Sequence, residues 1–113
     1  MLEHKYDKYY TYDELTEALN ILVGLYPNYA SIDSIGKSYE NRDVWCITIT
    51  DFSTGEPEHK PAIYIDGNTH AGEVTGSIAA LYTADYLLSN KDKSDVRELL
   101  QTTTFYIIPR VNP

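Results

Sequence analysis

The chain has 113 residues, close to the usual size of one domain, so we expect a single compact unit. Its net charge of −8 disfavours nucleic acid and anionic membranes as partners, because an acidic surface repels phosphate. Hydrophobic residues make up 42% of the chain, which argues against wholesale disorder. No apolar stretch approaches the roughly 20 residues of a transmembrane helix, and the first residues lack the apolar region of a signal peptide.

The single cysteine, Cys46, permits neither an internal disulfide nor a zinc cluster built from cysteines. It lies within an apolar run. We therefore expect it to be a buried small hydrophobic residue rather than a nucleophile.

The N-terminal part of the chain predicts an arm followed by a helix. Residues 1–10 are polar and rich in tyrosine, and they are expected to form an extended arm. Thr11 and Glu14 have the spacing of a capping box at the start of a helix. Apolar residues then recur at helical spacing until Pro27, which predicts a helix over residues 12–26.

The next segments favour β-structure. Residues 30–38 alternate loosely, and residues 44–50 are rich in β-branched and aromatic side chains, so both are predicted strands. The short link between them predicts an antiparallel hairpin. Residues 51–60 are expected to form a solvated loop, in which His59 has no assigned role.

The second half of the chain alternates between strands and helices. Residues 62–65 form a continuous apolar run, which is typical of a strand covered on both faces. A helix is predicted over residues 73–88 and a short one to about residue 100, with Ser94 as its N-cap. Residues 103–108 form another apolar strand. This order indicates an α/β sandwich, and the end of the chain directly after a strand suggests the N-terminal part of a longer protein.

The loop after the strand over residues 62–65 contains the strongest candidate site. His70 and Glu73 are three residues apart, and imidazole and carboxylate groups are both good zinc ligands. The plain alternative is a surface histidine beside a glutamate that the helix dipole favours. Because sites in open α/β sheets form at the carboxyl ends of strands, the position strengthens the metal interpretation. For Asp66, a structural role at the end of the strand is favoured over a role as a hydrogen-bond acceptor that supports the metal site.

Five segments in order resemble the N-terminal part of the zinc metallocarboxypeptidases related to carboxypeptidases A and B. The first resembles the opening helix, and the second the Ile-Gly-x-Ser-x-Glu-Gly-Arg turn of that family. The others resemble the strand before the metal loop, the His-x-x-Glu motif and the start of the Asn-Pro-Asp-Gly turn. They are residues 12–15, 35–42, 61–67, 70–73 and 108–113.

The resemblance implies a three-layer α/β/α sandwich with a mixed sheet, of which residues 1–113 are the N-terminal portion of the catalytic domain. It implies that His70 and Glu73 are two of three protein ligands to zinc. The third ligand, the general-base glutamate and the arginine that binds the substrate carboxylate are expected downstream of Pro113. The implied activity is zinc-dependent hydrolysis of C-terminal bonds in peptide substrates. With no catalytic residue of its own, the isolated chain is expected to be inactive.

Two departures from the family pattern affect the interpretation. Gly72 stands where digestive members have an arginine, so their substrate specificity does not carry over. Asn41 replaces a glycine in the turn, and asparagine tolerates the left-handed conformation. The alternatives are a related zinc amidohydrolase or deacylase acting on acylated amino acids, or a non-catalytic domain that retains the fold. An incomplete sheet also favours self-association of the fragment.

Overall fold

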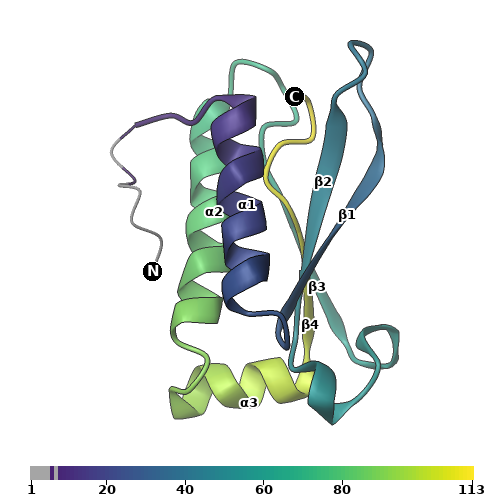
Figure 1. Ribbon diagram of the computed structural model, residues 1–113, viewed down its shortest axis with the longest axis vertical. Helices are drawn as coiled ribbons and strands as arrows, with labels where there is room; N and C mark the ends of the chain where they lie inside the picture. Colours follow the sequence, from purple (N-terminus) through teal and green to yellow (C-terminus); the bar gives the residue numbers. More distant parts are fainter. Residues whose placement is uncertain (1–5, 7) are drawn as a thin grey trace.

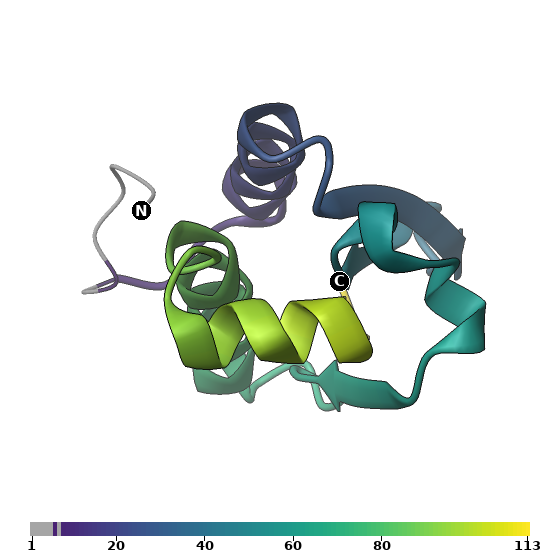
Figure 2. The ribbon, with the colours of Figure 1, turned by 90° about the horizontal axis from the view of Figure 1, so that it is seen from below.

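The computed structural model describes residue 6 and residues 8–113. Its strands form one mixed sheet in the order β1-β2-β4-β3, in which β3 is parallel to β4 and the other pairs are antiparallel. Helices α1 and α2 lie side by side on one face of this sheet, and α3 crosses one end (Figures 1 and 2). The elements are α1 (Tyr12–Leu25), β1 (Ala30–Lys37), β2 (Asp43–Ile49), β3 (Ala62–Asp66), α2 (Val74–Ser89), α3 (Ser94–Thr102) and β4 (Thr104–Ile108).

Helix α1 begins at the predicted capping box. The Thr11 hydroxyl accepts from the Glu14 amide at 3.2 Å, and the Glu14 carboxylate accepts from the Thr11 amide at 2.9 Å. These bonds satisfy two amides at the helix terminus. The helix ends at Leu25, shortly before Pro27, as predicted. Of the predicted arm over residues 1–10, residues 1–5 and 7 lie outside the described residues.

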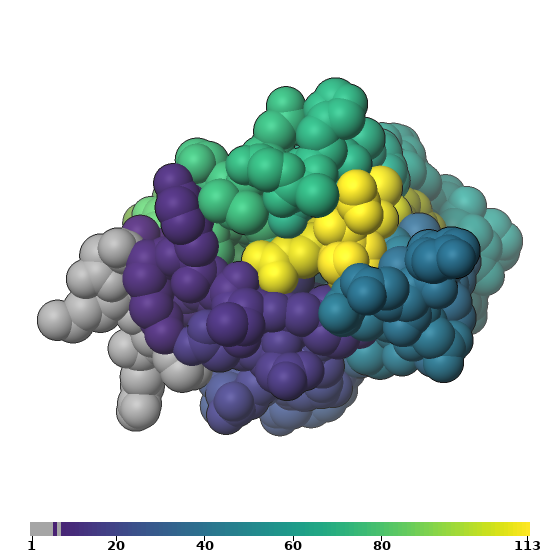
Figure 3. All heavy atoms as spheres, turned by 90° about the horizontal axis from the view of Figure 1, so that it is seen from above, coloured from purple at the N-terminus to yellow at the C-terminus, as the bar shows by residue number. Residues whose placement is uncertain are grey.

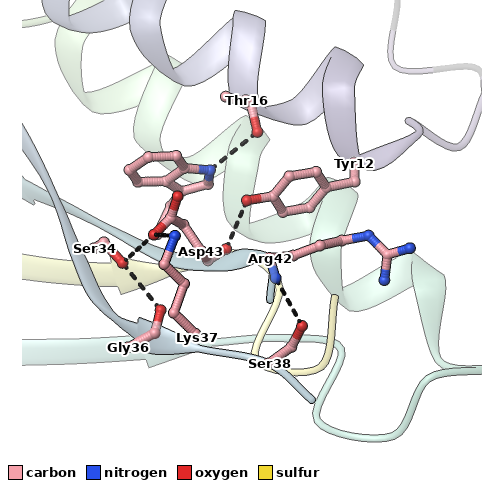
Figure 4. A network of polar contacts seen from close by, with 9 residues as sticks. Tyr12, Thr16, Ser34, Gly36, Lys37, Ser38, Arg42 and Asp43 are labelled. Atoms are coloured by element: carbon pink, nitrogen blue, oxygen red, sulfur yellow. Dashed lines mark hydrogen bonds and ion pairs between the residues drawn. The ribbon is translucent and has the colours of Figure 1, made fainter. Parts of the chain in front are cut away.

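The predicted hairpin is formed by β1 and β2, and its turn places Asn41 at a φ of 67°. Two hydrogen bonds tie α1 to this hairpin: the Tyr12 hydroxyl donates to the Asp43 carbonyl at 2.8 Å, and the Trp45 indole donates to the Thr16 hydroxyl at 3.0 Å (Figure 4). A further hydrogen bond from Ser34 holds the pKa of the Asp43 carboxyl below its usual value. The hairpin is therefore fixed against the helical layer.

A single core fills the space between the sheet and the helices. It includes buried side chains from α1, α2, α3, β2 and β4, among them Leu19, Ile47, Leu81, Leu100 and Ile107. Cys46 points to the other face of the sheet and is still only 8% exposed, as expected for a small hydrophobic residue. Burial raises the pKa of its thiol. None of the described helices is both long enough and apolar enough to cross a membrane.

Two predictions about individual elements differ from what the structure shows. Within the described residues, the apolar run over residues 62–65 is an edge strand that is not covered on both faces: Ile63 is 42% exposed and Tyr64 is 59% exposed. The reason is that β3 pairs only with β4 within the described residues. In α3, Lys93 occupies the N-cap position and Ser94 is the first helical residue.

The mixed α/β architecture and the mixed sheet agree with the predicted fold class. The described residues supply two of its three expected layers, namely the four-stranded sheet and one layer of helices. The second face of the sheet carries Tyr64, at the edge, and its neighbour Tyr106 on β4.

Candidate metal site

The segment that carries His70 and Glu73 connects β3 to α2, at the carboxyl ends of the two parallel strands. It is held by the chain that follows β4. The Gly67 amide donates to the Ile108 carbonyl at 3.0 Å, and the Val111 and Asn112 amides donate to the carbonyls of Gly67 and Asn68 at 3.0 and 3.1 Å. Figure 3 shows this end of the molecule, where the yellow C-terminal residues lie between the purple start of α1 and the green start of α2. Residues 67–73 are called the metal loop below.

The metal loop brings the two predicted ligands together. Nδ1 of His70 donates a hydrogen bond to Oε1 of Glu73 at 2.8 Å. A turn supports this approach, because the Glu73 amide donates to the His70 carbonyl at 2.9 Å. Both side chains face solvent, with 80% of the His70 side chain and 63% of the Glu73 side chain exposed. Within the described residues, the pair is therefore accessible to a metal ion from solvent.

The chemistry and spacing of this pair fit zinc. Two ligands of a tetrahedral zinc ion, each about 2.0–2.2 Å from the metal, lie roughly 3.4 Å apart. Nδ1 and Oε1, now 2.8 Å apart, need to separate by only about half an ångström to meet that requirement. Nδ1 has to lose its proton before it can bind the metal, because a ring nitrogen binds through its lone pair; the neutral imidazole then carries its proton on Nε2.

The described residues contain no complete metal-binding group of three His, Cys, Asp or Glu side chains. Asp66, at the end of β3, accepts a hydrogen bond from the Tyr64 hydroxyl at 2.7 Å. His59 is exposed in the 3₁₀ turn Pro57–His59. Among the described residues, His70 and Glu73 therefore form a pair without a third such side chain beside them.

The start of the metal loop packs closely against the first turns of α2. A Cβ atom on Gly67 would lie 2.5 Å from the carbonyl oxygen of Gly76, a distance that real side chains do not reach. The glycine at position 67 therefore permits the close approach of β3 to α2. Gly72, by contrast, has no atom within 4 Å of an added Cβ, so the fold around this position does not require glycine.

Two residues that sequence analysis did not single out also hold this region. Asn68 is 4% exposed, has a φ of 59°, and donates from its side-chain amide to the carbonyls of His70 and Ala71. The only sequence signal was the Gly-Asn pair, which is common in turns.

Arg110, in the segment after β4, is the second of these residues. Its guanidinium donates to the Tyr10 carbonyl at 2.7 Å and to the Ser77 hydroxyl at 3.1 Å. Ser77 is fully buried on α2, one turn after Glu73. Burial lowers the pKa of Arg110, and its Nε has no hydrogen-bond partner within the described residues. Arg110 thus links α2, the start of α1 and the segment after β4, which no local sequence pattern indicated.

Comparison with known proteins identifies the family. The family model described as zinc carboxypeptidase matches residues 15–113. The chain belongs to the zinc carboxypeptidase family. The matched region contains the hairpin, β3, the metal loop and β4, so the resemblance seen in the sequence motifs is confirmed.

Individual members of the family are similar over almost the whole chain. Carboxypeptidase B of Astacus astacus is 33% identical over 105 residues, which are 93% of this chain and 33% of that protein. Carboxypeptidase A2 of Rattus norvegicus is 32% identical over 109 residues, covering 96% of this chain and 25% of that protein. The crystal structure of carboxypeptidase A from Helicoverpa armigera has a TM-score of 0.83 at 27% identity, covering 96% of this chain and 26% of the other. The chain therefore spans a quarter to a third of the length of these zinc carboxypeptidases.

Proposed function

We propose that this chain is the N-terminal portion of the catalytic domain of a zinc metallocarboxypeptidase, which hydrolyses C-terminal peptide bonds. Membership of the zinc carboxypeptidase family supports this proposal. The observation that carries it is the convergence of His70 and Glu73, 2.8 Å apart and exposed at the carboxyl ends of parallel strands.

In this proposal His70 and Glu73 are two of the protein ligands to zinc. Neutral imidazole binds through the nitrogen that now faces Glu73, and the carboxylate supplies a negative oxygen beside it. When bound, zinc supplies polarisation of the substrate carbonyl and a water of lowered pKa. The exposure of both side chains leaves the approach to that position open.

The remaining parts of the catalytic domain follow Pro113. They comprise a third ligand, a general base and a group that binds the terminal carboxylate of the peptide. They also complete the three-layer α/β/α sandwich. The exposed Tyr64 and the edge strand β3 support this, because an exposed apolar edge is normally paired or covered.

Substitution of the proposed ligands in the full-length protein tests the function. We expect His70→Ala and Glu73→Ala to lose bound zinc and the release of C-terminal residues from peptides. The loss should exceed the 10–100-fold that removal of a residue outside the coordination shell usually causes. Zinc content is measured after gel filtration, and activity is measured on peptides and on N-acylated amino acids.

His59→Ala is the matched control, because it removes an exposed histidine that precedes β3, whereas the metal loop follows the other end of that strand; it should change neither zinc content nor activity. Near-stoichiometric zinc in His70→Ala would contradict the assignment of the metal site. Hydrolysis of acylated amino acids without release of C-terminal residues would instead indicate the deacylase alternative.

A further inference from the structure

Asn68 is a buried polar side chain in a loop whose following residues, 69–73, are all exposed. It is 4% exposed, whereas the neighbouring His70 and Glu73 side chains are 80% and 63% exposed. A buried amide is unfavourable unless it forms hydrogen bonds. The hydrogen bonds of the Asn68 side chain therefore indicate its structural role.

The side-chain amide of Asn68 binds the main chain between the two proposed ligands. Its Nδ2 donates to the His70 carbonyl at 2.9 Å and to the Ala71 carbonyl at 3.3 Å. The same His70 carbonyl accepts from the Glu73 amide at 2.9 Å. The His70 carbonyl thus accepts hydrogen bonds from two groups, the side-chain amide of Asn68 and the backbone amide of Glu73.

The backbone of Asn68 is adapted to the same task. Its φ of 59° is in the left-handed region, which asparagine and glycine adopt more readily than other residues. Its carbonyl accepts from the Asn112 amide at 3.1 Å, which anchors the loop to the segment after β4. Asn68 therefore supplies a left-handed backbone position, joins the loop to the segment after β4 and binds the carbonyl of His70.

We propose that Asn68 is a positioning residue of the metal loop, whose amide holds the His70 carbonyl so that Nδ1 of His70 and Oε1 of Glu73 converge before zinc binds. The inference rests on the proposed function. It assigns no contact with the metal to Asn68. Removal of this amide should leave both ligands in the protein and make their relative position less defined, which weakens zinc binding.

The chain provides a closely matched control for this inference. Asn41, in the turn between β1 and β2, has a φ of 67°, so Asn41→Gly and Asn68→Gly remove the same atoms from positions of similar positive φ. Both glycine variants preserve the positive φ without strain. Only the substitution at position 68 removes hydrogen bonds to the metal loop.

The test measures zinc affinity of the full-length protein by competition with a chelator. We expect Asn68→Gly to bind zinc at least 10-fold more weakly than the parent, and Asn41→Gly to bind within twofold of it. The visible spectrum of the Co²⁺-substituted protein should change in Asn68→Gly alone, because it reports the geometry of the ligands. Unchanged zinc affinity and an unchanged spectrum in Asn68→Gly would overturn the inference.

A second variant keeps the inference testable if Asn68→Gly does not fold. Asn68→Asp retains size and shape, but at pH 8 the carboxylate has no N–H to donate to the two carbonyls. Its added negative charge by itself favours zinc, so weaker binding in this variant supports the positioning role and equal or tighter binding rejects it. The His70→Ala variant separates the two proposals. If it retains zinc, the proposed function is rejected. If it loses zinc while Asn68→Gly binds zinc as tightly as the parent, only the role of Asn68 is rejected.

Discussion

Replacing Gly67 by alanine tests the close approach of β3 to α2 that shapes the metal loop. The added Cβ would lie 2.5 Å from the Gly76 carbonyl oxygen, 2.6 Å from the Gly76 carbonyl carbon and 3.1 Å from the Ser77 amide nitrogen. All three are backbone atoms. They cannot rotate away as the end of a side chain can, so the strand end and the helix have to separate.

The size of the effect follows from these distances. A comfortable contact lies near 3.5–4.0 Å, so the shortest distance of 2.5 Å requires a movement of about 1 Å. Overpacking of this kind typically destabilises a protein by about 1–3 kcal/mol, and we expect the upper part of that range. The movement shifts the start of α2, and with it Glu73, relative to His70. Zinc affinity should therefore fall together with stability.

Urea denaturation of the full-length protein measures this effect. Gly24→Ala in α1 is the control, because nothing lies within 4 Å of its added Cβ. In a helix, alanine is more favourable than glycine by up to about 1 kcal/mol, so Gly24→Ala should raise the urea midpoint while Gly67→Ala lowers it. If Gly67→Ala unfolds at the same urea concentration as the parent, the contact does not constrain the fold as argued.

Two further predictions concern the N-terminus of α1 and the isolated chain. Hydrogen bonds from Lys8 and the Thr11 backbone lower the pKa of Glu14 to about 2, so this carboxylate stabilises the fold above its unfolded pKa of about 4.5 and loses that contribution as the pH falls towards 2. Urea midpoints of Glu14→Gln should therefore be lower than those of the parent near pH 6 and converge with them near pH 2; a constant difference would contradict the linkage. Residues 1–113 alone should show no zinc-dependent carboxypeptidase activity and should self-associate in light scattering, because the edge strand β3 and Tyr64 are exposed. Zinc-dependent turnover by this chain, lost in His70→Ala, would show that the downstream groups are not required.

The elements that sequence analysis located correctly depend on local signals. The capping box of Thr11 and Glu14 fixes the start of α1 through contacts three residues apart. The tolerance of asparagine for positive φ explains why the turn with Asn41 survives without glycine. The hydrogen bond between His70 and Glu73 also joins residues three apart in sequence, but the loop that carries them is held by a distant segment of the chain.

The features that sequence analysis missed depend on contacts between distant segments. The apolar composition of β3 is compatible with a central strand or an edge strand, and only the number of its pairing partners decides between them; within the described residues β4 is the one partner. Asn68 owes its anchoring to Asn112, and Arg110 owes its position to the carbonyl of Tyr10 at the other end of the chain. Periodicity and spacing carry no information about such partners.

The pairing of the metal loop with the segment after β4 also determines when the loop can form during synthesis. Gly67 and Asn68 obtain their backbone donors from Val111 and Asn112, which leave the ribosome roughly 40 residues later. Until then a nascent chain contains both proposed ligands without the backbone hydrogen bonds that support the metal loop. Formation of the parallel β3–β4 pair has to bring these distant segments together, so it is expected to be a late step of folding. Stable metal capture would then follow docking of β4 and would not precede it.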